Sequence, residues 1–226
     1  MFIYDEYYLL YAILVLAITI FAQLRIKLTF SKYSKIKCNF TGFDSANLVL
    51  NQNEVNGVQF YKSQGYLSDH FDPMDNSISL SGMVYNNNSI SAIGVGAHEA
   101  GHAVQMAKDY FPMRLRHNLV PVTNFSSMLA MPLVFLGLIS VQDFLINIGI
   151  LLFSISVLFH IVTLPVESDA SRRALLALEE SGRLTEEELE GAKKVLMAAR
   201  FTYIAAILTS VLSLLRLIMI ANRRKR

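Results

Sequence analysis

Cysteine is almost absent from this chain, which has Cys38 as its single thiol in 226 residues. One thiol cannot form an intramolecular disulfide, and it is too few for the cysteine clusters that hold structural zinc. The residues around Cys38 contain no local motif that would activate the thiol as a nucleophile. We therefore expect Cys38 to be an ordinary packed residue.

Charge is also scarce: 17% of residues are charged and the net charge is +2, too small to indicate a nucleic-acid partner. Repeats and low-complexity tracts are not evident. Hydrophobic residues make up 53% of the chain, and its mean hydropathy is +0.40. A soluble core could not cover so much apolar surface, so the composition predicts a membrane protein.

Four apolar segments are long enough to cross a bilayer, namely residues 7–24, 119–141, 144–166 and 201–221. The first lacks both the preceding positive charge and the following small-residue site of a cleaved signal peptide, which predicts an uncleaved anchor. We predict a mainly α integral membrane protein with about four membrane helices. A small α+β domain, with a short antiparallel sheet and a helix, should accompany them.

The stretch His98-Glu99-Ala100-Gly101-His102 is the one whose residue types and spacing together indicate a chemistry. On a helix, His98 and His102 lie on one face, so both imidazoles can bind a single metal ion. Glu99 follows the first of these histidines, where its carboxylate can act as the general base of a metalloprotease without being a ligand. Ser89 or Ser91 can cap the start of this helix.

Residues 30–117 form the least apolar part of the chain and are predicted to hold most of the catalytic domain. Thr41 has the character of a helix N-cap. Residues 55–61 and 77–85 alternate well enough to be strands ahead of the HExxH helix. We expect residues 77–85 to offer an exposed edge along which a peptide substrate could pair as an added strand.

Catalytic zinc needs a third protein ligand and an open position for water. Glu167 is favoured, because the helix that it opens presents small residues that could pack against the small face of the HExxH helix. A carboxylate at a membrane boundary is also costly to bury without a cation. The alternative to zinc binding is that the Glu167 carboxylate forms an ion pair with Arg172 or Arg173. The other candidate ligands are His117, His160 and the cluster from Asp69 to Asp72, for which we favour turn or supporting roles.

Three segments together resemble the YugP-type membrane-bound neutral zinc metallopeptidases. They are LSDHFDP at residues 67–73, AHEAGHAVQ at 97–105 and LPVESDASRRAL at 164–175. The resemblance covers nearly the whole chain and implies the gluzincin scheme of HExxH plus glutamate, with Glu167 as the glutamate. Gluzincins usually place an aspartate four residues after that glutamate to orient a zinc-bound histidine. Ser171 stands there in this chain, so the partner of the histidines is left open.

Basic residues between Arg25 and Lys37, together with Arg114, Arg116, Arg172 and Arg173, place the catalytic segment on the cytoplasmic side by the positive-inside rule. The domains expected are a membrane anchor at 1–29, the catalytic segment at 30–117, a transmembrane hairpin at 118–166 and a third-ligand region with a final membrane segment at 167–226. Basic residues flank residues 201–221 on both sides, so the direction of that span is left open.

The expected function is that of a multi-pass zinc endopeptidase of a bacterial plasma membrane. One Zn²⁺ per chain would be held by His98, His102 and Glu167, with Glu99 activating a zinc-bound water. Substrates would be small, misfolded or membrane-associated proteins cleaved at the cytoplasmic membrane surface. The alternative is a non-catalytic membrane scaffold with a closed, four-ligand zinc site. The lipid bilayer is an expected partner, whereas membrane-protein partners and homo-oligomers are left open.

Overall fold

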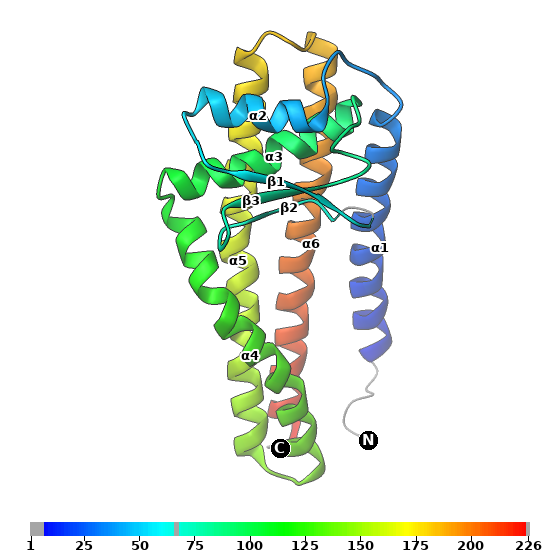
Figure 1. Ribbon diagram of the computed structural model, residues 1–226. Coiled ribbons are helices and arrows are strands. Elements are labelled where there is room, and N and C mark those ends of the chain that lie inside the picture. Colours follow the sequence, from blue (N-terminus) through cyan, green and yellow to red (C-terminus); the bar gives the residue numbers. More distant parts are fainter. Residues whose placement is uncertain (1–6, 66–67, 225–226) are drawn as a thin grey trace. The chain divides into compact units, whose positions relative to one another are not determined.

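The computed structural model describes residues 7–65 and 68–224 of the chain. Its elements (Figure 1) are α1 (Tyr8–Tyr33), α2 (Gly42–Gln52), β1 (Gln59–Ser63), β2 (His70–Asp72), β3 (Ser77–Ser81), α3 (Ile90–Ala107), α4 (Phe111–Ile139), α5 (Asp143–Glu180) and α6 (Glu186–Arg224). Two compact units divide the chain. Unit 1 comprises Met1–Gln23, Leu115–Leu164 and Thr202–Arg226, and unit 2 comprises Leu24–Arg114 and Pro165–Phe201.

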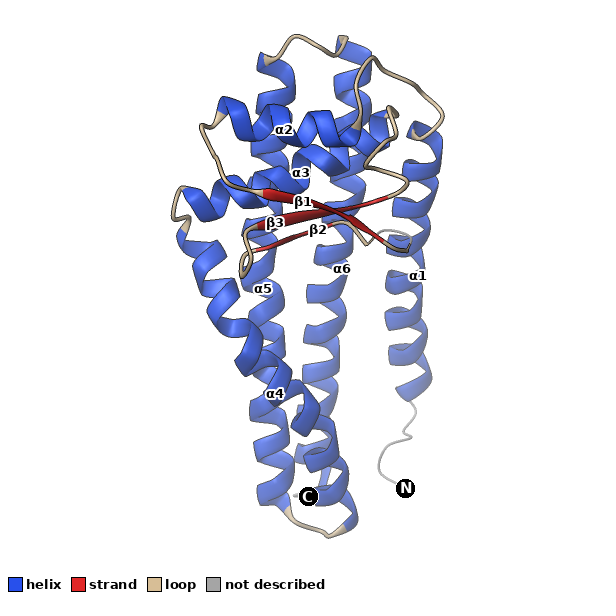
Figure 2. Ribbon diagram, in the orientation of Figure 1, coloured by secondary structure: helices blue, strands red, loops and turns tan. Residues whose placement is uncertain are grey.

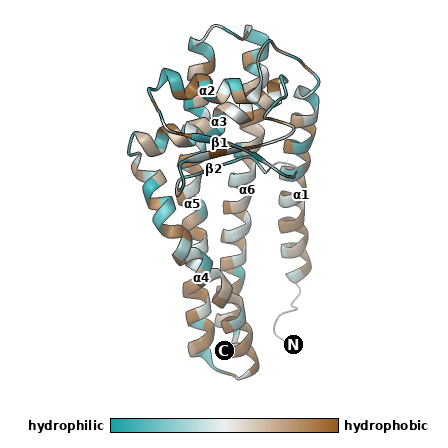
Figure 3. Cartoon of the chain, viewed as in Figure 1, coloured by the Kyte–Doolittle hydropathy of each residue, from teal (hydrophilic) through white to brown (hydrophobic). Residues whose placement is uncertain are grey.

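Four of the described helices, α1, α4, α5 and α6, are long and apolar enough to cross a membrane. Each carries one of the four predicted spans, and long apolar stretches mark them in Figure 3. The fold class expected from the sequence, a mainly α membrane protein with a small α+β part, is confirmed. Residues 201–221 lie inside the uninterrupted helix α6.

Unit 1 contains a charged residue in an apolar run, Arg216 of α6. Its side chain is buried, and its guanidinium lies 5.9 Å from the centre of the Tyr8 ring on α1. On the same two helices, the hydroxyls of Tyr11 and Ser213 are hydrogen-bonded at 2.9 Å. A charge in an apolar span should face the protein, and Arg216 does.

The small sheet of unit 2 has the strand order β1-β3-β2 (Figure 2). It is mixed, because β1 runs parallel to β3 while β2 runs antiparallel to it. The prediction of an antiparallel sheet missed β2, a strand of three residues that is too short to show alternation. β3 is therefore the central strand, with neighbours on both sides. The prediction that residues 77–85 form an exposed edge is wrong.

Helix α3 occupies the middle of unit 2, where α2 packs against it and β2 and β3 contact it. Thr41 begins α2 with a capping box that includes Asp44. Ser89 is the N-cap of α3, and its hydroxyl accepts a hydrogen bond from the Ala92 backbone N–H. A side chain at Gly96 of α3 would collide with the backbone of Gly42, so glycine allows α2 and α3 to approach this closely.

Candidate active site

The HExxH segment lies in α3, as its spacing predicts. His98 and His102 are one turn apart, and their rings meet edge to face with centroids 4.7 Å apart. The alanines at positions 97, 100 and 103 are buried, so small residues surround the two imidazoles on the neighbouring faces of the helix. The sequence thus produces a helix that can pack closely on several sides while it presents two ring nitrogens together.

Helix α5 brings Glu167 to these histidines through a close contact between backbones. A Cβ atom at Gly101 would lie 2.5 Å from the carbonyl oxygen of Ala170, a distance that no side chain tolerates. Ala170, Ser171 and Ala174 are buried on α5. The expected packing of small residues of one helix against small residues of the other is confirmed. This close packing requires glycine at position 101.

The side chains of His98, His102 and Glu167 converge on one point. The Nε2 atom of His98 lies 3.1 Å from Oε2 of Glu167, and Nε2 of His102 lies 3.4 Å from the same oxygen. One ligand atom from each residue falls within 4.8 Å of the others, which makes this a group that could hold a metal ion. Glu167 and His102 are buried and His98 is partly buried.

The opposite ring nitrogen of His102 is held by a buried glutamine. Gln105 donates from its amide nitrogen to the carbonyl of Val166 at 2.8 Å and to Asp169 at 3.0 Å. Its side-chain oxygen is then left to accept a hydrogen bond from Nδ1–H of His102, at 3.1 Å. In neutral His102 this fixes the proton on Nδ1, so the Nε2 lone pair points toward the Glu167 carboxylate.

His98 is held by Ser171, whose hydroxyl lies 3.1 Å from Nδ1. Ser171, four residues after Glu167, is thus the partner of one histidine that the sequence left open. Asp169 reaches the other histidine, His102, through Gln105 rather than directly. Gln105 was not among the residues predicted for the site, although its position three residues after His102, on a helix rich in small residues, is a signal that the sequence contains.

Arg172 and Arg173 are paired with Asp169, each with an N–O distance of 2.5 Å. They therefore do not support the alternative in which these arginines neutralise Glu167. The buried carboxylate of Glu167 instead faces two imidazole nitrogens, one of which presents a lone pair.

Two imidazoles and one carboxylate form a set of ligands that suits Zn²⁺. A lone pair that faces a carboxylate is repelled by it, and a cation bound between them would remove this repulsion.

Glu99 lies beside this group on the side of the sheet. Its carboxyl is buried, and burial raises its pKa to about 7. A backbone N–H of Phe71, in β2, donates a hydrogen bond to this carboxylate. A carboxylate with a pKa near neutrality can both take up and release a proton at physiological pH, as acid–base catalysis requires.

Of the other predicted candidates, Asp69 accepts hydrogen bonds from the backbone N–H and hydroxyl of Ser81. Asp72 accepts a hydrogen bond from the Met74 N–H, as a turn residue does. Burial raises the pKa of Cys38 to about 12, so this thiol is not poised for metal binding or nucleophilic attack.

His117 and His160 lie in unit 1, where Nδ1 of His160 contacts the carbonyl of Ser156 on its own helix. Nδ1 of His70, in unit 2, contacts the carbonyl of Ser68. Among the described residues, the group that could hold a metal consists of His98, His102 and Glu167. His117, His160 and the Asp69–Asp72 cluster are not members of it.

Comparison with known proteins agrees with the chemistry of this group. The model of the family described as "putative neutral zinc metallopeptidase" matches residues 8–222. The chain is also 43% identical over 208 residues to "Putative membrane protease YugP" of Bacillus subtilis (strain 168), covering 91% of this chain and 92% of that protein. No solved structure matches the chain. The chain is a membrane protein and belongs to this family of neutral zinc metallopeptidases.

Proposed function

We propose that the protein is a zinc-dependent endopeptidase that binds one zinc ion per chain through His98, His102 and Glu167. The observation that carries this proposal is the convergence of these three donors beside the buried carboxyl of Glu99. Zinc at this point would polarise a peptide carbonyl and lower the pKa of a bound water. Membership of a zinc peptidase family supports the same chemistry.

The residues of this chain have distinct roles in the proposed reaction. Ser171 and Gln105 hold the two imidazoles by their Nδ1 atoms, which leaves both Nε2 atoms directed at the metal position. Glu99 accepts a proton from the attacking water and delivers it to the nitrogen of the departing amine. Its buried environment favours the uncharged carboxylic acid and so makes it a competent donor in that second step.

The alternative function, a scaffold with structural zinc, requires a closed site with four protein ligands. Among the described residues, the metal-binding group contains three side chains of the ligating types. Three ligands leave a coordination position for water or substrate, which is the arrangement of catalytic zinc sites. The geometry therefore supports an enzyme over a scaffold.

Zinc removal tests the proposed activity. Purified full-length protein in detergent should contain one zinc ion and cleave a fluorescence-quenched peptide library. A chelator should abolish the cleavage, and one equivalent of zinc should restore it, because the metal supplies the electrophile. Protein that holds zinc in equimolar amount but cleaves none of the peptides before or after reconstitution would favour the scaffold, and cleavage that survives complete zinc removal would contradict a zinc mechanism.

We also propose that the site operates on the cytoplasmic side of a bacterial plasma membrane, on small, misfolded or membrane-associated polypeptides. The support is the distribution of basic residues. Arginine and lysine follow the apolar part of α1 from Arg25 to Lys37, whereas the α4–α5 connection at Gln142 contains no basic residue.

Cysteine labelling in intact cells tests this orientation. In a Cys38→Ala background, a cysteine at the exposed position Lys35 should resist a membrane-impermeant maleimide, and one at the exposed position Gln142 should react. Both cysteines should react once the cells are permeabilised, which controls for accessibility. The reverse pattern in intact cells would place the site on the outer side.

A further inference from the structure

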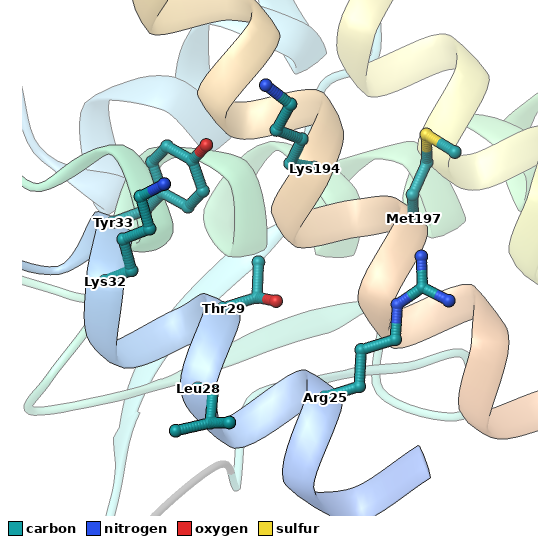
Figure 4. A pocket seen from close by; sticks show the side chains of 7 residues that line it. All are labelled: Arg25, Leu28, Thr29, Lys32, Tyr33, Lys194 and Met197. Carbon is teal, nitrogen blue, oxygen red and sulfur yellow. The ribbon is translucent and has the colours of Figure 1, made fainter. Parts of the chain in front are cut away.

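A pocket of about 420 Å³ lies between α1 and α6 within unit 2. Figure 4 shows the residues that line it, which come from α1 and α6. They are Arg25, Leu28, Thr29, Lys32, Tyr33, Lys194 and Met197. None of them belongs to the zinc site, and the proposed peptidase reaction assigns them no role.

Three of the lining residues are cations. The guanidinium of Arg25 lies 4.8 Å from the ring centre of Phe201, and the Lys32 ammonium lies 5.3 Å from the ring centre of Tyr33. Ring contacts of this kind hold a cation in place but leave its charge uncompensated. Lys194 is 3.7 Å from Glu190, a carboxylate that it shares with Lys193. The pocket therefore combines an excess of positive charge with hydroxyl donors.

The same pocket has an apolar side that is open to its surroundings. Leu28 is 67% exposed and Met197 is 50% exposed. Both residues lie near an end of the apolar part of a membrane-length helix. The apolar run of α1 ends before Arg25, and that of α6 begins at Phe201. Cations beside exposed apolar side chains at the end of a membrane span are the surroundings of a lipid headgroup.

We propose that this pocket binds the phosphate of an anionic glycerophospholipid. Arg25, Lys32 and Lys194 provide the positive charge, and the hydroxyls of Thr29 and Tyr33 can donate hydrogen bonds to phosphate oxygens. An acyl chain of the same lipid covers Leu28 and Met197. Free inorganic phosphate could use the cations alone but would leave this apolar surface uncovered, which is why we assign a lipid.

Lipid binding to purified protein in neutral detergent tests the proposal, with native mass spectrometry as the readout. Wild-type protein should retain phosphatidylglycerol over phosphatidylcholine. The pocket variant Arg25→Gln/Lys32→Gln/Lys194→Gln should bind phosphatidylglycerol at least about tenfold more weakly, because each basic residue near a headgroup contributes to anionic lipid binding.

The matched control is Lys27→Gln/Lys35→Gln/Lys193→Gln. It removes one charge from α1, one from the turn that follows α1 and one from α6, but none from the pocket lining. It should keep its affinity for phosphatidylglycerol within about twofold of wild type, since its targets are outside the pocket. Equal losses in both variants would indicate a diffuse surface attraction and overturn the site. If the triple pocket variant does not fold, each single substitution should still weaken binding by about threefold, and three neutral single variants would overturn the site too.

Competition with inorganic phosphate distinguishes a phospholipid ligand from free phosphate. At millimolar concentration, inorganic phosphate should displace phosphatidylglycerol only weakly from wild-type protein, because it cannot cover Leu28 and Met197. The lipid assignment would be wrong if inorganic phosphate bound the pocket as tightly as the phospholipid does.

Discussion

Replacement of Glu99 by glutamine is expected to lower kcat for peptide hydrolysis by about 10²- to 10⁴-fold, the usual contribution of a general base. The amide has the size of the carboxyl and can still accept the hydrogen bond from the Phe71 N–H. It cannot take the proton of the attacking water. Zinc content should stay at the wild-type value, because Glu99 is not one of the three convergent donors.

Peptide turnover and zinc analysis on the same preparation measure both quantities. Glu187→Gln is the matched control: it makes the same chemical change at an exposed position of α6 and should leave kcat unchanged. Retained turnover in Glu99→Gln would remove Glu99 from the role of base. Loss of zinc along with turnover would instead make Glu99 a ligand or a structural support of the metal site.

Glu167→Ala is expected to weaken zinc binding by more than about 100-fold, because changes in residues that only support metal ligands already cost 10- to 100-fold. Removal of a ligand leaves two imidazoles on α3 and breaks the link between α3 and α5 through the metal. Glu167→Gln should have a similar effect on zinc while it preserves the volume of the side chain in its buried position. Peptide hydrolysis should fall with zinc occupancy.

Competition with a chromophoric chelator measures the affinity, and circular dichroism checks that the helices persist. Glu180→Ala, at the exposed end of the same helix, is the control and should bind zinc as wild type does. If Glu167→Ala and Glu167→Gln both keep wild-type zinc affinity while folded, the third ligand lies elsewhere in the chain.

The two histidines of the candidate site could be predicted because helical periodicity alone fixes their relation. His98 and His102 share a face whatever surrounds them, and the small residues after Glu167 indicated the neighbouring helix. The supporting contacts could not be predicted in this way. Whether Ser171 or Asp169 would reach a histidine depends on how α3 and α5 pack side by side. That packing is set by the contact of Gly101 with the Ala170 backbone, which no local pattern reveals.

The fold shows the same division between local and distant determinants. Apolar length predicted the four membrane helices, and capping residues predicted the starts of α2 and α3. The sheet was predicted less well because strand order depends on pairing between distant residues. A strand as short as β2 carries no periodic signal, and its insertion beside β3 turned an expected edge into the centre of the sheet.

The discontinuity of unit 2 has a consequence for the order of events during synthesis. The ribosome completes Leu24–Arg114, with both histidines, before it makes the fifty residues Leu115–Leu164 of unit 1, and Glu167 follows only after them. Domains fold as their segments emerge, so under the proposed ligand set the nascent chain holds two ligands without the third during that interval. The complete set of proposed ligands is therefore present only after the α4–α5 hairpin has been translated, so translation of the hairpin precedes any zinc site with three protein ligands.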